Sequence, residues 1–294
     1  MITGANGGVG RVLVAHFADR GWHVYAGVRT HAAGDELGRG RRTVTPVLLD
    51  VLDEDSRAEA ARTVAEHLQR AGLAGLGGLV NNAGKSTDGP LELTPAEELV
   101  ESFALNVVGP VAVAQAFLPL LRPVGGRIVN MGGAAGRVAM PMYGALSASK
   151  AALDSVSDVL RMELIHQGVG VSYIEPGGLD TSFFHSSAQA RLRDGYAGDA
   201  TTQAIYASAI KRAATAMSAM KPGQIQPVAE AIERALTAKK PSPRYVVGRD
   251  AKTITRVVRR LPTHTRDKAI MRAMDLKPDA FVPRGPKAAP AQEV

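Results

Sequence analysis

The 294-residue sequence contains no cysteine. This absence excludes a disulfide framework, a thiol nucleophile and a thiolate metal site, and it is compatible with a reducing compartment. The seven histidines show no spacing typical of metal ligands, so we expect no bound metal. Aromatic residues are also scarce, at 4%, whereas the hydrophobic share of 45% is ordinary for a globular protein with a substantial core.

Features of membrane and exported proteins are missing as well. We find no apolar run near the roughly 20 residues that span a bilayer, and no basic and then apolar leader at the N-terminus. Together with the lack of cysteine, this predicts a soluble, cytoplasmic protein.

Positive charge is concentrated at one end of the chain. Residues 239–294 hold 14 Lys and Arg against 5 Asp and Glu, which gives this segment a net charge of +9. The whole chain carries +7, so residues 1–238 carry −2. The near-neutral body argues against nucleic-acid binding. The basic tail leaves open a weak contact with a membrane surface or with an acidic partner.

Short apolar runs alternate along the chain with longer amphipathic stretches. The runs are rich in β-branched residues and bounded by Gly, Pro or Asn, which is typical of strands. The predicted strands are 23–28, 44–50, 78–84, 127–131, 171–175 and 244–248. The predicted helices are 9–20, 55–71, 95–121, 147–167 and 227–239. The alternation predicts an α/β fold, a doubly wound parallel sheet of the Rossmann type with its ligand crevice beyond the C-terminal ends of the strands.

The first strand of such a sheet is almost absent from the sequence. Only Met1 and Ile2 precede the first glycine-rich loop, although a strand of about 5–6 residues should stand there. We therefore expect that the native chain starts upstream of Met1, which the intact mass of the native protein would test.

The stretch TGANGGVG opens the first predicted helix. Glycines at a strand-to-helix turn let the backbone come close to a pyrophosphate that rests on the helix N-terminus. The candidate cofactor-binding residues in this loop are Thr3, Gly4, Asn6, Gly7, Gly8, Val9 and Gly10. A purely structural turn is the alternative, but the position of the loop at the first strand-to-helix turn favours phosphate binding.

With this T-G-x-x-x-G-x-G spacing, the chain from Ile2 to about Gly248 resembles the short-chain dehydrogenase/reductase (SDR) family. Other family motifs follow in the same order, namely N-N-A-G at 81–84 and P-G-x-x-x-T at 176–181. The resemblance implies further cofactor contacts from Asp50, Val51, Asn82, Ala83, Gly84, Lys150, Pro176, Gly177 and Thr181. It implies one SDR domain at 1–249 with a helical lid at about 181–227, followed by a basic helical extension at 250–294 whose end we expect to be disordered.

The choice of nucleotide is made at the end of the second strand. An acidic residue there accepts a hydrogen bond from the ribose 2′-hydroxyl, whereas an arginine pairs with a 2′-phosphate. The sequence has Arg29 and no carboxylate at this point, which favours NADP(H) over NAD(H). A solvated strand-end charge is the alternative reading of Arg29.

The residues that carry catalysis in the family are only half present. Family members use a tyrosine and a lysine in Y-x-x-x-K, on one helix face, with an upstream serine and an asparagine. The lysine lowers the tyrosine pKa from about 10 toward working pH. Here Asn106 and Lys150 are present, but Leu146 stands in the tyrosine's place and Gly133 is the best match to the serine.

Leu146 cannot transfer a proton, and a positioned acid–base is worth roughly 10²–10⁴-fold in rate. An imine, iminium or conjugated acceptor needs such help less than a simple ketone. Three interpretations stay open: an oxidoreductase for such an acceptor, a non-redox enzyme (cyclase, dehydratase or isomerase), or a cofactor-binding pseudoenzyme. Tyr143 is a candidate substitute acid, and its alternative role is a loop aromatic packed against the lid.

The lid and the tail suggest the partners of the protein. The large apolar and aromatic residues of the lid are Phe183, Phe184, Tyr196, Tyr206, Met217 and Met220. They predict a broad apolar pocket for a small molecule, or alternatively pack the lid onto the sheet. His185 and Tyr196 are further candidate proton donors. The basic amphipathic helix at 250–261 either caps the domain or touches a membrane surface. The resemblance also implies a homodimer or homotetramer packed through the helices that hold Asn106 and Lys150.

Overall fold

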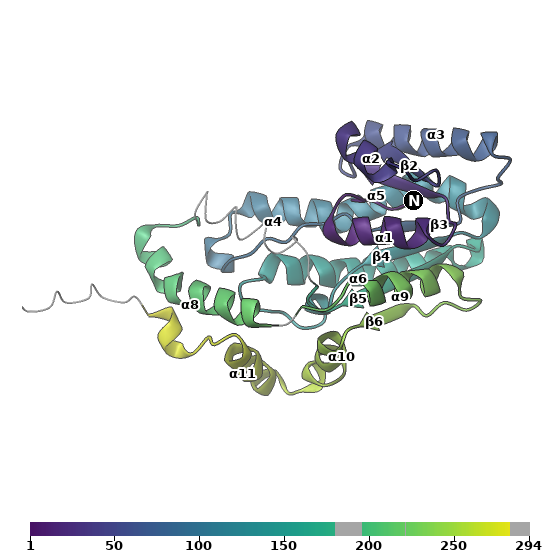
Figure 1. Cartoon of the computed structure of the whole chain (residues 1–294). Coiled ribbons are helices and arrows are strands. Elements are labelled where there is room, and N and C mark those ends of the chain that lie inside the picture. Colours follow the sequence, from purple (N-terminus) through teal and green to yellow (C-terminus); the bar gives the residue numbers. More distant parts are fainter. Residues whose placement is uncertain (180–195, 221, 283–294) are drawn as a thin grey trace, which may run out of the picture.

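The computed structural model describes residues 1–179, 196–220 and 222–282 (Figure 1). Its strands are β1 (Val24–Val28), β2 (Val44–Leu48), β3 (Gly78–Asn81), β4 (Arg127–Met131), β5 (Gly170–Pro176) and β6 (Arg244–Val247). Its α-helices are α1 (Gly8–Ala18), α2 (His31–Gly38), α3 (Glu54–Arg70), α4 (Ala96–Phe103), α5 (Gly109–Leu121), α6 (Gly144–Leu164), α8 (Ala200–Ala219), α9 (Gln226–Thr237), α10 (Arg249–Arg256) and α11 (Thr263–Ala273). Every predicted strand and helix is present, with ends shifted by a few residues.

All strand pairings are parallel. β1 pairs with β2, and β3, β4, β5 and β6 follow one another in the second group. Ile2 joins the two groups, because it forms parallel bridges to Ala26 of β1 and to Val80 of β3. The spatial order is therefore β2–β1–Ile2–β3–β4–β5–β6, which confirms the predicted doubly wound fold. The chain changes its direction of winding at Ile2, so the ligand crevice lies where the glycine-rich loop begins.

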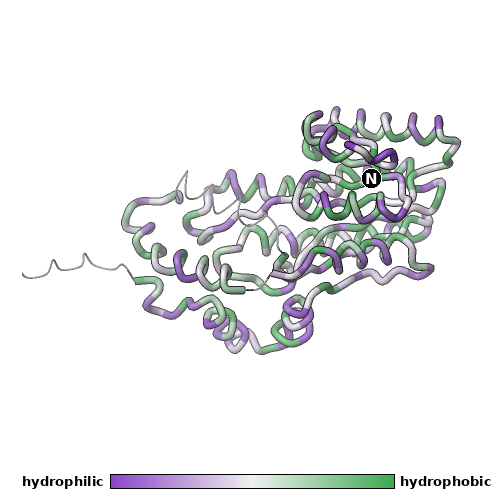
Figure 2. The backbone as a smooth tube through the Cα atoms, in the orientation of Figure 1, coloured by the Kyte–Doolittle hydropathy of each residue, from purple (hydrophilic) through white to green (hydrophobic). Residues whose placement is uncertain are grey.

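Two apolar cores cover the two faces of the sheet. Helices α1 and α9 pack on one face, where Phe17 and Ile232 are buried. Helices α3 and α5 pack on the other face, where Val64 and Phe117 are buried. Figure 2 shows hydrophobic residues gathered in the sheet and hydrophilic residues on the outer turns of the helices. Because both faces are covered, most positions of the strands are apolar.

Helices α4 and α5 belong to one helical stretch, Ala96–Val124, with a π-helical turn at Ala104–Val108. By length and composition alone this stretch could cross a membrane, so the expectation that no such apolar run exists is wrong. In the fold it serves as a core helix, since α5 packs on α3 and β3 and buries Val113 and Leu121.

The C-terminal extension packs against the lid helix α8. Its contact with α8 is an apolar cluster whose fully buried members are Met274, Leu276, Ala280, Ala209 and Ala213. An ion pair of 2.5 Å between Arg212 of α8 and Asp279 closes the contact. The helix predicted at 250–261 is shorter than expected, because α10 ends at Arg256. The residues after α10 thus pack on α8, and the capping role expected for the helix at 250–261 stays a prediction.

Candidate active site

The glycine-rich loop places the N-terminus of α1 at the crevice. Gly4 has a φ of +59°, and a Cβ there would lie 3.0 Å from the Cα of Ala83. A Cβ on Gly10 would lie 2.3 Å from the Gly4 carbonyl oxygen, so only glycine allows this close approach. No described side chain caps α1 at Gly7, and Asn6 and Gly7 are exposed. The first-turn N–H groups are therefore available to an anion, and a dinucleotide pyrophosphate fits this cradle.

Thr3 ties this loop to the N-N-A-G segment after β3. Its Oγ1 accepts hydrogen bonds from the backbone N–H groups of Asn82 and Ala83, at 3.0 and 2.9 Å. The Asn82 side chain donates in return to the carbonyl oxygens of Thr3 and Gly4, at 3.0 and 3.1 Å. The glycine-rich loop and the N-N-A-G segment, which ends at Gly84, lie some 80 residues apart in the sequence. These hydrogen bonds join them into one wall of the crevice.

The residues predicted to select the nucleotide follow β1 and β2. Arg29 is exposed directly after β1, and no described carboxylate lies within ion-pair distance of it. Asp50 and Val51 follow β2, where the Asp50 carboxylate accepts the N–H of Leu52 at 2.9 Å and Val51 is buried. The neighbouring strands thus bring Arg29 and Asp50 to the same edge of the sheet, where a guanidinium can pair with a phosphate.

Lys150 lies on α6 and is 7% exposed. Its ammonium donates to the carbonyl oxygen of Met131, the last residue of β4, at 2.7 Å. Burial lowers the pKa of Lys150 to about 8. A cation that can exchange its proton near neutral pH therefore lies at the C-terminal end of the central strands.

Asn106 lies in the π-helical turn and is fully buried. Its Nδ2 donates to the Lys85 carbonyl oxygen and to the Ser149 hydroxyl, both at 3.0 Å, and its Oδ1 accepts the Lys85 N–H at 3.0 Å. Because Ser149 directly precedes Lys150, Asn106 fixes the lysine-bearing helix to the loop after β3. The Ser149 hydroxyl also donates to the Leu146 carbonyl oxygen at 3.0 Å, so it has a structural role.

Leu146 lies one turn before Lys150 on α6 and is 4% exposed. Gly133 follows β4 with a φ of 173°, an extended backbone that any residue adopts. A Cβ on Gly133 would meet no described heavy atom closer than 4.0 Å. The structure thus brings Lys150, Leu146 and Gly133 to one region, and the last two offer neither a proton nor a hydrogen bond from a side chain.

Tyr173 of β5 is a site residue that the sequence did not single out. It is 2% exposed, and its O–H donates to the Lys150 carbonyl oxygen at 2.9 Å. A Cβ on Gly132 would lie 1.9 Å from the Tyr173 Cζ, so the glycine makes room for the ring. Burial and the carboxylates of Asp154 and Glu175 raise the pKa of Tyr173, which keeps the phenol protonated. The available signal was a tyrosine within an otherwise apolar buried strand.

Tyr143 directly precedes α6, and a parallel bridge joins it to Gly89. Burial and the carboxylate of Asp88 raise the pKa of Tyr143, so its phenol is a weaker acid than free tyrosine. Together with Met140 and Met142 it packs on the apolar cluster that the extension forms with α8. This packing agrees with the loop-aromatic reading, and the substitute-acid role of Tyr143 stays a prediction.

The turn after β5 carries the P-G motif. The Gly177 N–H donates to the Val247 carbonyl oxygen at 3.2 Å, and the Gly178 N–H donates to the Asp250 carboxylate at 2.8 Å. Pro176 ends β5. Thr181, predicted to hold the nicotinamide carboxamide, lies outside the described residues. Asp250 is a second site residue that sequence reasoning missed.

The lid is described from residue 196 onward, with a gap at 221, so Phe183, Phe184 and His185 lie outside the described residues. The Tyr196 ring lies over Gly89, since a Cβ there would be 2.6 Å from its Cε1. Tyr206 instead lies between the segment after β3 and the extension. Its O–H donates to Glu92 of that segment at 2.7 Å, and its ring meets Phe281 of the extension edge-on.

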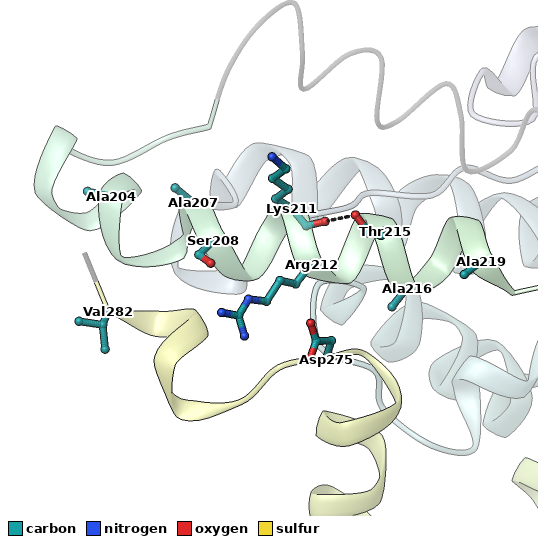
Figure 3. A pocket seen from close by; sticks show the side chains of 10 residues that line it. All are labelled: Ala204, Ala207, Ser208, Lys211, Arg212, Thr215, Ala216, Ala219, Asp275 and Val282. Atoms are coloured by element: carbon teal, nitrogen blue, oxygen red, sulfur yellow. Dashed lines mark hydrogen bonds between the residues drawn. The ribbon is translucent and has the colours of Figure 1, made fainter. Parts of the chain in front are cut away.

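Met217 is half-buried and Met220 is exposed. A separate groove of about 600 Å³ runs along α8 beside the extension, lined by alanines together with Lys211, Arg212 and Asp275 (Figure 3). It contains none of the crevice residues described above.

Comparison with known proteins agrees with this fold. The short chain dehydrogenase family matches residues 1–192. Human retinol dehydrogenase 5 is 34% identical over 262 residues, which cover 86% of this chain and 81% of that protein. Human 17-beta-hydroxysteroid dehydrogenase type 6 is 32% identical over 292 residues, covering 92% and 87%.

Two solved structures share the fold over nearly their whole length. A short-chain dehydrogenase from Streptomyces avermitilis has a TM-score of 0.71 and 29% identity, with 93% of this chain and 94% of that chain covered. A short chain dehydrogenase from Burkholderia cenocepacia, solved in complex with NADP, has a TM-score of 0.69 and 25% identity, covering 94% and 96%.

Proposed function

Since this chain belongs to the short-chain dehydrogenase family, we propose that it is an NADP(H)-dependent oxidoreductase with a non-standard active site, acting on a fairly large apolar small molecule. The observation that carries the proposal is a contrast within one crevice. Its nucleotide half has the glycine-rich loop and the buried ammonium of Lys150, whereas Leu146 and Gly133 stand at the positions that the family resemblance assigns to the tyrosine and the serine.

The residues present would hold the nucleotide in a defined order. The N-terminus of α1 would receive the pyrophosphate, and Arg29 would pair with a 2′-phosphate. Lys150, Pro176 and Gly177 would surround the nicotinamide half. The bound nucleotide supplies or accepts a hydride. NADP in the Burkholderia cenocepacia complex is compatible with this choice, and Arg29 is the feature of this chain that favours it over NAD.

The lack of a side-chain proton donor at Leu146 and Gly133 decides which hydride acceptors are suitable. A ketone oxygen would receive neither a proton from Leu146 nor a hydrogen bond from Gly133, and the missing acid alone is worth roughly 10²–10⁴-fold. An iminium carbon is already activated by positive charge, and a conjugated acceptor spreads the incoming charge. We therefore favour an imine, an iminium or a conjugated acceptor over a simple ketone.

The apolar character of the substrate is supported by the residues at and before the start of α6. Leu146 is buried, and Met140, Met142 and Tyr143, which precede it in the chain, are partly buried. The two human relatives are named for retinol and for a hydroxysteroid, both large apolar molecules.

A non-redox enzyme or a cofactor-binding pseudoenzyme is the second candidate function. It is favoured by the raised pKa of Tyr143, which leaves no activated phenol near Lys150 among the described residues.

A fluorescence titration with NADPH and NADH tests the nucleotide part of the proposal. We expect tight binding with NADPH preferred, and loss of that preference in Arg29→Ala, because the 2′-phosphate would lose its cation. Binding of neither nucleotide by the folded protein would favour the second candidate, and so would activity that is unchanged when nucleotide is omitted.

A double substitution tests the catalytic part. Leu146→Tyr with Gly133→Ser should raise ketone reduction by roughly 10²-fold or more, since the proton donor and the hydrogen bond would both be restored. The matched control is Leu146→Phe with Gly133→Ala, which adds similar volume without hydroxyls. A folded, NADPH-binding double mutant that is no better than this control on a panel of ketones would contradict the assignment of these two positions.

We also propose that the chain forms a homodimer or homotetramer through α4, α5 and α6. A groove of about 480 Å³ lies between α5 and α6. The exposed large apolar residues on these helices are Val100, Phe103, Val159 and Met162, and Val108 and Ile165 lie directly beside them. Light scattering should show an oligomer that Met162→Glu with Ile165→Glu converts to a monomer. An unchanged mass would contradict this interface.

A weak contact of the basic extension with an anionic membrane surface is proposed separately. Arg256, Arg259 and Arg260 are exposed next to the exposed Val257. Binding to anionic vesicles should fall with salt and in Arg259→Glu with Arg260→Glu, because both remove the attraction of the basic residues. Binding that is insensitive to both would contradict it.

A further inference from the structure

Three glycines surround one carboxylate at the C-terminal edge of the sheet. A Cβ on Gly177 would lie 1.9 Å from Oδ2 of Asp250, and a Cβ on Gly248 would lie 2.6 Å from its Oδ1. The Gly178 N–H donates to Oδ2 at 2.8 Å. Asp250 lies in the first turn of α10, so the start of the C-terminal extension is fastened directly to the turn after β5.

No basic side chain among the described residues pairs with this carboxylate. Within those residues no Lys, Arg or His nitrogen lies within 4.0 Å of Asp250, and its hydrogen-bond donor is a backbone N–H. The carboxylate is exposed rather than buried. With respect to the described residues, Asp250 therefore carries an unpaired negative charge that solvent weakens.

Topology places this charge on the nicotinamide half of the crevice. A Cβ on Gly133 would lie 4.0 Å from the Pro176 carbonyl oxygen, and Lys150 bonds to the last residue of β4. The turn held by Asp250 thus adjoins the reacting region, at the ends of β4, β5 and β6. The glycine-rich loop and Arg29 lie at the ends of the other strands, and a dinucleotide spans both halves of such a crevice.

We propose that Asp250 is a positioning residue that holds the Gly177–Gly178 turn and, by its charge, stabilises the oxidised nicotinamide relative to the reduced one. The inference rests on the proposed function. The oxidised ring carries a positive charge and the reduced ring is neutral, so an adjacent carboxylate favours the first. In an exposed site one unit charge changes the affinity for the charged form by roughly three- to tenfold. The bound nucleotide is thereby biased toward giving up its hydride.

The test compares the dissociation constants of NADP⁺ and NADPH, by fluorescence quenching, for the unchanged protein and Asp250→Asn. The amide still accepts the Gly178 N–H but carries no charge. We expect NADP⁺ to bind roughly three- to tenfold more weakly in Asp250→Asn, while NADPH binding stays within twofold. Asp250→Glu, which keeps the charge, should retain the original ratio. Asp267→Asn on α11 is the matched control for losing one acidic charge from the extension.

The outcomes separate this inference from the proposed function. Equal weakening of both nucleotides in Asp250→Asn would mean that the residue only holds the turn, and an unchanged ratio would also overturn the charge effect. In either case tight binding by the unchanged protein would leave the proposed function standing. If the unchanged protein bound neither nucleotide, both proposals would fail together.

Discussion

Gly132 and Tyr173 form a contact behind the site that leaves no room for a larger residue at position 132. In Gly132→Ala the new Cβ would lie 1.9 Å from Cζ and 2.2 Å from the hydroxyl of Tyr173, far inside van der Waals contact. The ring is fully buried and its O–H is bonded to the Lys150 carbonyl oxygen, so it cannot move aside freely. Overpacking costs roughly 1–3 kcal/mol, and a lost buried hydrogen bond costs about as much.

We therefore expect Gly132→Ala to lower the free energy of unfolding by about 4 kcal/mol. Urea unfolding followed by the fluorescence of the single tryptophan, Trp22, measures this change. Gly133→Ala is the matched control, because its Cβ would meet nothing closer than 4.0 Å and its backbone is extended. The control should be neutral or slightly stabilising, since alanine restricts the unfolded chain.

A double-mutant cycle identifies the cause. Tyr173→Val leaves a cavity by itself, but combined with Gly132→Ala it removes the clash, so the pair should cost at least 1 kcal/mol less than the sum of the single changes. If Gly132→Ala were as stable as Gly133→Ala, or if the two changes were additive, the steric account of Gly132 would be wrong.

Three other predictions follow from named contacts. Burial lowers the pKa of Lys150 from 10.5 to about 8, so between these pH values the unfolded chain binds more protons than the folded one. The free energy of unfolding should therefore rise as the pH increases from 8 to 10.5. In urea titrations, Lys150→Met should remove about 3 kcal/mol of that rise. Arg137→Met should cost about 3 kcal/mol, because it removes the 2.5 Å partner of the buried Glu175 carboxylate, and adding Glu175→Gln should recover much of the loss. Thr3→Val should lower the free energy of unfolding by roughly 1–3 kcal/mol and weaken nucleotide binding, because it leaves the N–H groups of Asn82 and Ala83 without their acceptor. Unchanged stability and affinity would contradict the role of Thr3 in joining the two loops.

The strands and the main helices were predictable because local signals agree with the tertiary structure. β4 was predicted residue for residue, since its β-branched core lies between glycines and charges. Helix α2 was missed because it has only eight residues and little periodicity. It depends on the Thr30 side chain, which accepts the Ala33 N–H at 3.3 Å, and on contact of Gly34 with Pro46 of β2. The π-helical turn inside the predicted helix at 95–121 likewise has no local sequence signature.

The candidate site was predictable only where motifs have fixed spacing. Lys150, Asn106 and the glycine-rich loop could be placed because each stands at a set distance from a strand end. Tyr173 and Asp250 could not, because their importance arises from contacts with Gly132 and Gly178 that lie far away in the chain. A single sequence shows a tyrosine in a strand and an aspartate in a helix, but not what either one touches.

The energetics of Lys150 support nucleotide binding as the central property of the crevice. Burial of its ammonium opposes folding by about 3 kcal/mol at neutral pH, judged from its lowered pKa. Asn106 and Tyr173 nevertheless fix the helix around it, through Ser149 and through the Lys150 carbonyl oxygen. The residue one turn before Lys150 is Leu146, so among the described residues no phenol at that position could use this charge. A ligand with hydroxyl or phosphate oxygens at the crevice would offset its cost, and a dinucleotide lying on the glycine-rich loop provides such oxygens.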